Sequence, residues 1–270
     1  MCYYNGVLVS REDFIRLKQL EKAATSINLH RPMQSGFDYS DWPIIKPTSD
    51  CDWEITTMEW GFLPDTWFGK PIDTRAKAER FRKGFPNLSG KMEQGITTLN
   101  AMAEELLLPG KIYRESALQR RCLIFSSGFY EWRHVYRNNK KTGLPLKTPD
   151  KYPYHITVKD AKYYFIAGIW KPWTDKETGE TIDTFALVTT KANKIMEQVH
   201  NSKMRMPTIL SEQLASEWIS DGLSEERITQ IATNQFPTEM MEAHTIQKDF
   251  RTAQDPKLKH QYAELPELLL

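Results

Sequence analysis

Residues 121–132 read Arg-Cys-Leu-Ile-Phe-Ser-Ser-Gly-Phe-Tyr-Glu-Trp, and the analysis of the fold starts from this stretch. Residues 122–125 form a short, continuous apolar run, which is typical of a buried strand. Residues 126–128 (Ser-Ser-Gly) then predict a turn or a bulge. Residues 129–132 continue the strand, because aromatic residues favour extended backbone.

Side chains alternate between the two faces of a strand, so the continuation has two different sides. Phe129 and Glu131 share one face, and Tyr130 and Trp132 share the other. Glu131 is therefore either an exposed strand residue or a buried carboxyl group. If it is buried, desolvation raises its pKa, because burial disfavours the charged form.

The remaining periodicity predicts one α+β domain over residues 1–240. Further strands are expected at 3–9 (with a turn at Asn5-Gly6), 53–63, 154–158, 163–169 and 184–189. Helices are expected at 11–24, 111–121, 191–200, 210–220 and 224–232. Residues 75–83 carry five basic side chains and predict a solvated helix or loop face.

Two segments rich in polar residues, Pro and Gly predict loops: 30–52, with a short strand at 43–45, and the hairpin loop 133–151. Asn100 lies near a change from strand to helix, because β-branched residues give way there to helix formers. From residue 241 to 270 we expect a polar tail whose apolar end docks on the same domain.

Composition narrows the classes of function. The net charge is +1, so binding to nucleic acid would need a local basic groove. Three cysteines without CxxC spacing argue against a disulfide framework and a cysteine-based zinc site, and we expect no metal or cofactor. No apolar run approaches the roughly 18–20 residues of a membrane span, and no signal peptide is recognisable. These features favour a cytoplasmic protein without a membrane partner.

The chain begins Met1-Cys2. Removal of Met1 would give Cys2 a free α-amine, with a reference pKa of about 7.7–8.0, next to a thiol of about 8.5. Such an amine can form a Schiff base with an aldehyde, and the thiol can then close a thiazolidine ring. The same pair suits attack on an acyl group, as in N-terminal-nucleophile hydrolases.

Several segments taken together resemble the SOS-response-associated peptidase (SRAP) family, the abasic-site processing proteins. They occur in this order: Met1-Cys2, Trp60-Gly61-Phe62-Leu63-Pro64, Asn100-Ala101-x-Ala103-Glu104, Arg121-Cys122-Leu123-Ile124, Gly128-Phe129-Tyr130-Glu131-Trp132, Ala167-Gly168-Ile169-Trp170, residues 185–193, and His200 followed by Arg205-Met206-Pro207. The resemblance implies a barrel-like, mainly antiparallel β-sheet with flanking helices. It also implies covalent capture of abasic sites in single-stranded DNA, thiol-dependent processing of the N-terminus, and a role in the SOS response and DNA repair.

Carried over to this chain, the resemblance makes Cys2 the crosslinking residue and Asn100, Glu131 and His200 its active-site partners. Glu131 would shuttle protons. His200 would protonate the sugar ring oxygen, and Asn100 would donate to the deoxyribose. Without the family, His200 is equally a residue at a helix end and Asn100 an N-cap.

DNA contacts are expected from basic and aromatic side chains. The phosphate-contacting positions are Arg114 and Arg205, with Lys203 and Arg75 as further cations of the groove, and the stacking candidates are Trp60, Trp67 and Trp132. Trp60 and Trp132 are equally compatible with the core.

The sequence also departs from the family pattern at positions where the family contacts DNA. Tyr3-Tyr4 replaces the usual Gly-Arg, Met102 replaces an Arg, and residues 201–203 are an insertion. We expect a monomer. Two alternatives to crosslinking stay open: a cysteine peptidase or amidase, and a single-strand-binding module with an inert Cys2.

Overall fold

A closed five-stranded barrel forms the centre of the protein in the computed structural model, which describes residues 2–8, 30–48, 53–87 and 89–269. Its strands pair in a ring in the order β3 (Asp41–Pro47), β4 (Trp53–Trp60), β14 (Thr181–Lys191), β13 (Tyr164–Thr174) and β10 (Arg121–Ser126). The β14–β4 pair is parallel and the other four are antiparallel. Three short strands attach to this barrel: β9 (Asn100–Met102), β15 (Arg205–Pro207) and β16 (Ile209–Leu210).

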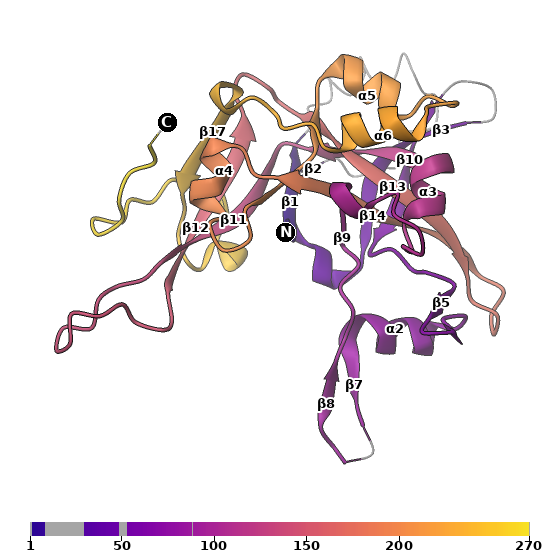
Figure 1. Cartoon of the computed structure of the whole chain (residues 1–270), viewed down its shortest axis with the longest axis horizontal. Helices are drawn as coiled ribbons and strands as arrows, with labels where there is room; N and C mark the ends of the chain where they lie inside the picture. Colours follow the sequence, from indigo (N-terminus) through magenta and orange to yellow (C-terminus); the bar gives the residue numbers. More distant parts are fainter. Residues whose placement is uncertain (1, 9–29, 49–52, 88, 270) are drawn as a thin grey trace.

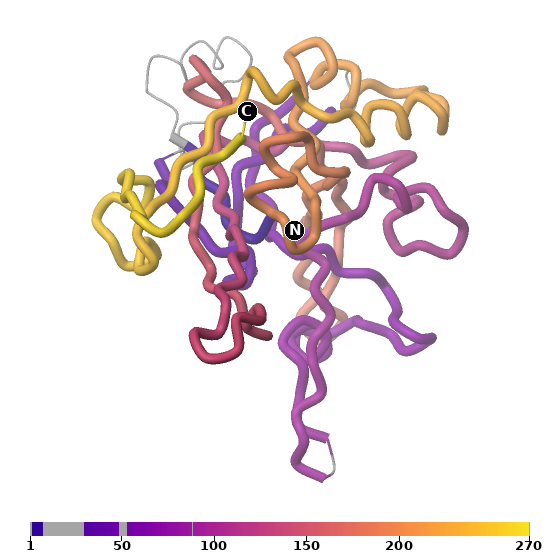
Figure 2. The backbone as a smooth tube through the Cα atoms, turned by 60° about the vertical axis from the view of Figure 1, so that its left-hand side comes forward, coloured from indigo at the N-terminus to yellow at the C-terminus, as the bar shows by residue number. Residues whose placement is uncertain are grey.

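A second, antiparallel sheet lies beside the barrel (Figure 1). Its strand order is β17 (Met241–Thr245), β12 (Asp150–Val158), β11 (Gly128–Val135), β1 (Tyr4–Leu8) and β2 (His30–Ser35). Two small hairpins, β5 (Thr66–Trp67) with β6 (Lys70–Pro71) and β7 (Gly84–Pro86) with β8 (Met92–Gln94), complete the strands. Figure 2 shows the β7–β8 hairpin standing away from the body of the molecule.

Helices flank the two sheets. They are α2 (Arg75–Lys83), α3 (Arg114–Gln119), α4 (Lys194–Val199), α5 (Glu212–Trp218) and α6 (Glu225–Ala232), with short 3₁₀ turns η2 (Gly36–Asp38), η3 (Ala103–Glu105), η4 (Thr238–Met240) and η5 (Phe250–Thr252). Ser211 and Ser224 cap α5 and α6, since each hydroxyl accepts from a backbone N–H of the first turn. Figure 1 shows α5 and α6 side by side over one side of the barrel.

The chain passes from the barrel to the second sheet at residues 126–128. Ser126 donates to the side chain of Asn5 (2.6 Å) and accepts from Gly128 N (3.2 Å), which ties β1 to the crossing. A Cβ atom at Gly128 would lie 2.2 Å from His155 Nε2, so this position requires glycine. The predicted turn or bulge is thus a crossing between two sheets.

The expected fold class, an α+β domain built on a barrel-like and mainly antiparallel sheet, is confirmed. The predicted faces of β11 are also correct, because Phe129 lies in the main core and Tyr130 packs with Phe250 on the other side. Among the residues that the structure describes, no helix is long and apolar enough to cross a membrane.

Two local predictions are wrong. Residues 30–52 contain strands β2 and β3, because their partners β1, β4 and β10 come from elsewhere in the chain. The short strand expected within this segment at 43–45 is confirmed, because these residues lie in β3. Asn5-Gly6 is no turn but a register irregularity within β1.

The C-terminal part begins with β17, which pairs with β12 as an edge strand of the second sheet. Further on, Gln198 and the backbone of Leu269 exchange two hydrogen bonds of 2.7 Å. The helix expected at 11–24 and Cys51 lie outside the described residues.

Candidate active site

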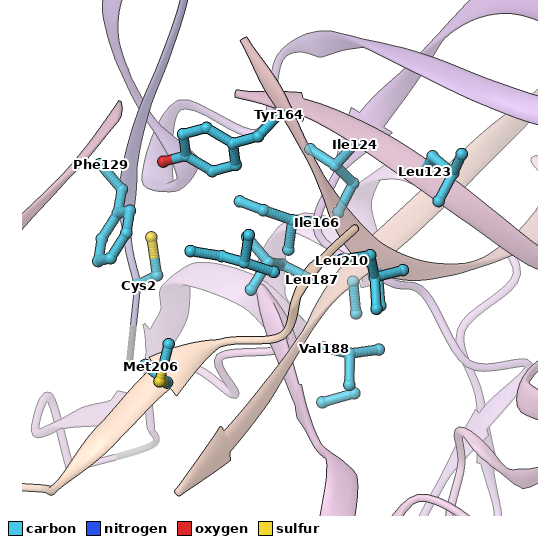
Figure 3. Packing of buried hydrophobic residues seen from close by; sticks show 14 of the residues in the cluster. Cys2, Leu123, Ile124, Phe129, Tyr164, Ile166, Leu187, Val188, Met206 and Leu210 are labelled. Carbon is cyan, nitrogen blue, oxygen red and sulfur yellow. The ribbon is translucent and has the colours of Figure 1, made fainter. Parts of the chain in front are cut away.

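The thiol of Cys2 lies in the main core, just before β1. Only 1% of this residue is exposed, and Sγ lies 3.5 Å from the carbonyl oxygen of Tyr4. Figure 3 shows Cys2 beside Phe129, with the hydroxyl of Tyr164 turned toward the same space. Burial raises the pKa of the thiol, and the nearby Glu131 carboxylate raises it further. The sulfur is therefore held as a neutral thiol while Glu131 is ionised.

Glu131 on β11 supplies a buried carboxyl group to the same region. It is 5% exposed, and burial raises its pKa from 4.5 to about 7. A carboxyl group with this pKa is present in both protonation states at neutral pH, as a general acid and base must be. His200 Nε2 lies 3.7 Å from Glu131 Oε2.

His200 is held at the end of α4 by its other ring nitrogen. Nδ1 lies 2.9 Å from the carbonyl oxygen of Arg205, which can only accept, so Nδ1 carries the proton. Burial is the main cause that lowers the pKa of this imidazole to about 4. The ring is therefore neutral at pH 7, and Nε2 presents a lone pair toward Glu131.

This arrangement changes the role expected for His200. An imidazole with a pKa of about 4 has no Nε2 proton to give to a sugar oxygen near pH 7. Glu131, with a pKa of about 7, can both donate and accept a proton near pH 7, and neutral His200 can only take up a proton that it passes on.

Asn100 contributes an amide with no partner of its own. The residue is 6% exposed, and neither Nδ2 nor Oδ1 has a hydrogen-bond partner among the described residues. A buried amide without partners costs free energy, about 1–3 kcal/mol. On β9, Asn100 pairs with Leu187 of β14. The amide is thus positioned by the barrel and available to a ligand, and it does not act as an N-cap.

The arginines expected to bind phosphate are engaged with carboxylates. Arg114 pairs with Glu225 (2.6 Å), Arg205 with Glu104 (2.6 Å) and Arg75 with Glu59 (3.1 Å), and Lys203 alone of the four cations is fully exposed. Among the described residues, three of the four cations expected to line a DNA groove are therefore each paired with a glutamate.

Arg205 makes contacts that hold β15 in place. Besides Glu104, it donates to the backbone and side chain of Thr189 on β14. The same Glu104 carboxylate also accepts from the backbone N–H of Lys191 (3.1 Å). These bonds fix β15, and with it the carbonyl group that orients His200.

The three tryptophans expected to stack on bases lie in different places. Trp60 is a core residue, 1% exposed, whose Nε1 donates to the carbonyl oxygen of Leu99 (3.0 Å), so the stacking prediction is wrong for it. Trp132 faces away from Glu131 and packs on Tyr4 (5.3 Å). Trp67 is partly buried and lies beside Phe68, which is 90% exposed.

Sequence reasoning missed two residues near the thiol. Tyr164 brings a buried hydroxyl toward Cys2 (Figure 3). Tyr3 is electrostatically coupled to both Glu131 and Cys2, and its ring packs on Phe37 at 4.9 Å. Tyr164 belongs to no sequence motif, and only the pairing of strands brings it near Cys2. In the sequence, Tyr3 is visible only as a departure from the family pattern. Within the described ranges, no group of three or more His, Cys, Asp or Glu side chains could hold a metal ion.

The closed barrel, the second sheet and the cluster of thiol, carboxyl and imidazole groups define a single-domain protein with a near-N-terminal cysteine in a buried acid–base site. The family model described as SOS response associated peptidase (SRAP) matches residues 7–253, and the chain belongs to this family.

The chain is also similar, at low sequence identity, to several curated proteins. The chain is 29% identical over 152 residues to the abasic site processing protein YoqW of Bacillus subtilis, which covers 56% of this chain and 61% of that protein. It is 24% identical over 176 residues to the abasic site processing protein HMCES of Xenopus tropicalis, covering 62% of this chain and 45% of that protein. The chain thus matches about half to three fifths of these relatives' length.

A solved structure shows the same fold. The crystal structure of a protein from Bacteroides thetaiotaomicron superposes with a TM-score of 0.73 at 24% identity, covering 96% of this chain and all of that one. This likeness supports the fold and carries no conclusion about chemistry.

Proposed function

We propose that this protein processes abasic sites in single-stranded DNA by forming a covalent crosslink through Cys2 after removal of Met1. The observation that carries the proposal is the buried cluster in which Glu131, with a pKa of about 7, lies beside the Cys2 thiol and 3.7 Å from His200. The printed names of the relatives, abasic site processing proteins, support the same substrate.

The chemistry needs no cofactor. The α-amine of Cys2 attacks the aldehyde carbon of the opened abasic sugar, and the resulting carbinolamine loses water to give an imine. The thiol then adds to the protonated imine, with sulfur bonding to carbon and the thiol proton returning to the group that protonated the departing hydroxide. One water molecule is released overall, and no oxidant or reductant is consumed.

Each buried group has a defined task in these steps. The protonated form of Glu131 supplies the proton that lets hydroxide leave as water, and its carboxylate form accepts the thiol proton. As the sugar ring opens, neutral His200 accepts the proton of the anomeric hydroxyl group and passes it to the ring oxygen, so the imidazole is neutral again afterwards. The amide of Asn100 donates from Nδ2 to the sugar oxygen, which gives this buried donor a partner.

Removal of Met1 belongs to the same proposal. The family is described as a peptidase family, and hydrolysis of the Met1–Cys2 peptide bond releases the amine that the crosslink needs. Intact mass of protein translated with aminopeptidases inhibited tests this step. Wild type should lose Met1 and Glu131→Gln should retain it; equal processing of both would assign the step to another enzyme. Release of unrelated peptides would instead favour a general peptidase.

The crosslink is tested on a denaturing gel with an oligonucleotide that contains one abasic site. Wild type should give a heat-stable adduct without reductant. Cys2→Ala and Cys2→Ser should each give no heat-stable adduct without reductant and only an imine that borohydride traps, because each variant keeps the amine but lacks the sulfur. A heat-stable adduct with Cys2→Ala would show that another residue attaches to DNA, and the proposal would have to be withdrawn.

A further inference from the structure

The loop that follows His200 lies against β11, the strand that carries Glu131. His200 is the C-cap of α4, and this helix packs against β11 (Figure 1). The carbonyl oxygen of His200 accepts from the backbone N–H of Met204 (2.8 Å), which closes the loop into a tight turn. Asn201 is the first residue of this turn after His200, and it also begins the insertion that departs from the family pattern.

The side chain of Asn201 makes two reciprocal hydrogen bonds with the backbone of His134 on β11. Its Oδ1 accepts from the His134 N–H (2.9 Å), and its Nδ2 donates to the His134 carbonyl oxygen (2.8 Å). A side-chain amide carries a donor and an acceptor, so it can bind a strand edge as the backbone of a neighbouring strand does. β1 pairs with β11 at Gly128–Tyr130, and Asn201 binds the strand farther along.

This contact connects the two groups of the proposed acid–base pair. His134 follows Glu131 by three residues on β11, and Asn201 directly follows His200. The bond between His200 Nδ1 and Arg205 connects the ring to β15, which pairs with the barrel strand β14. That bond orients the ring but does not connect it to β11. The two bonds of Asn201 supply this connection, and Nε2 lies 3.7 Å from Glu131 Oε2.

We propose that Asn201 is a positioning residue, which holds the loop of His200 against β11 and so keeps Nε2 beside the Glu131 carboxyl group. The same contact helps to exclude water, and burial is the main cause of the shifted pKa of both groups. Positive charge on His134 or Lys203 lowers the pKa of His200 further. The inference rests on the proposed function for the reaction that the pair serves, whereas the contact itself does not.

Asn201→Ala removes both hydrogen bonds, and NMR of protein with ¹⁵N-labelled histidine measures the effect on the His200 pKa. Asn201 is only partly buried, so the variant is expected to fold. A spectrum of His200→Gln identifies this ring among the six histidines. The wild-type ring should titrate with a pKa of about 4, and in Asn201→Ala the pKa should rise toward 6.5, because a released loop admits water. A residue that only contributed stability would leave the pKa of the folded protein unchanged.

The second measurement is the rate of crosslinking to an oligonucleotide with one abasic site under single-turnover conditions. Asn201→Ala should lower the rate constant at saturating DNA by up to about 10²-fold, since a misplacement of about 1 Å can cost that much. The DNA concentration that gives half of the maximal rate should stay the same, because the two lost hydrogen bonds involve no cation that could bind phosphate.

Gln198→Ala is the matched control. Gln198 also lies on α4, and its side-chain amide makes the same reciprocal pair of hydrogen bonds, but with the backbone of Leu269 and not with β11. This variant should keep the wild-type His200 pKa and crosslinking rate. Equal changes in Gln198→Ala and Asn201→Ala would show that any loosening around α4 has this effect, and the role assigned to Asn201 would be wrong.

The outcomes separate this inference from the proposed function. If the wild type crosslinks abasic DNA, an unchanged His200 pKa or an unchanged crosslinking rate in Asn201→Ala overturns the inference, and the proposed function stands. If the pKa rises in Asn201→Ala but the wild type forms no crosslink, Asn201 positions His200 and the proposed function fails.

Discussion

Replacement of Glu131 by glutamine is expected to stabilise the folded protein in alkaline solution while it disables crosslinking. Burial raises the pKa of this carboxyl group from 4.5 to about 7. Below pH 4.5 the group is protonated in the folded and the unfolded chain, so the shift has no effect on stability. As the pH rises from 4.5 to 7, the unfolded chain ionises first, and the folded state loses stability. Above pH 7 the folded state bears the full free-energy cost of ionising this buried carboxyl group.

The size of the effect follows from the shift. About 2.5 pH units at about 1.36 kcal/mol each give a cost of about 3 kcal/mol at pH 8 and about 1 kcal/mol at pH 5. Glutamine has nearly the same shape and carries no charge, so the variant should regain these amounts. At pH 8 this corresponds to a rise of roughly 6 °C in the melting temperature for a chain of this size.

Urea unfolding of wild type and Glu131→Gln at pH 5 and pH 8 measures the difference directly. Glu242→Gln is the matched control, since Glu242 is an exposed carboxylate on β17. Crosslinking by Glu131→Gln should be slower by about 10²–10⁴-fold, the range for a lost general acid or base. A stability gain that is the same at both pH values would show that burial does not shift this carboxyl group, and the assigned proton transfers would lose their basis.

Three other changes follow from the same contacts. Because the pKa of His200 is lowered to about 4, the folded state loses stability as the pH falls from 6.5 toward 4. His200→Gln should therefore reduce the loss of unfolding free energy that urea unfolding measures over this pH range. An unchanged dependence of the unfolding free energy on pH would contradict the neutral imidazole. Asn100→Ala should cut crosslinking by about 10²-fold or more yet cost little stability, because it removes an amide without partners, and a large loss in thermal unfolding would instead mark a structural residue. Trp60→Ala should destabilise the protein by about 3–5 kcal/mol in urea; if it weakened DNA binding without loss of stability, its place in the core would be wrong.

The local sequence was sufficient to predict features that depend on interactions between residues close together in the chain. The alternation around Glu131 correctly divided the side chains of β11 between two faces, because the strand period of two acts between adjacent residues. The apolar run at 122–125 and the serines that cap α5 and α6 are signals of the same short range. The ordered segments that resemble the SRAP family gave the fold class, which the structure and the family match confirm.

Tertiary structure decided which of these residues share a site and what state they are in. Residues 30–52 look like a loop by composition, yet their described part forms strands β2 and β3, because these strands pair with β1, β4 and β10 outside the segment. Trp60 has the same local sequence whether it stacks on a base or fills the core, and only the barrel around it distinguishes the two.

The same limit applies to charge and protonation. The carboxylates that engage Arg114 and Arg205 lie 111 and 101 residues away in sequence. The raised pKa of Glu131 and the lowered pKa of His200 both arise chiefly from burial. Burial is a property of the packed molecule, because desolvation depends on every group that excludes water from a site, and these groups come from strands distant in the sequence.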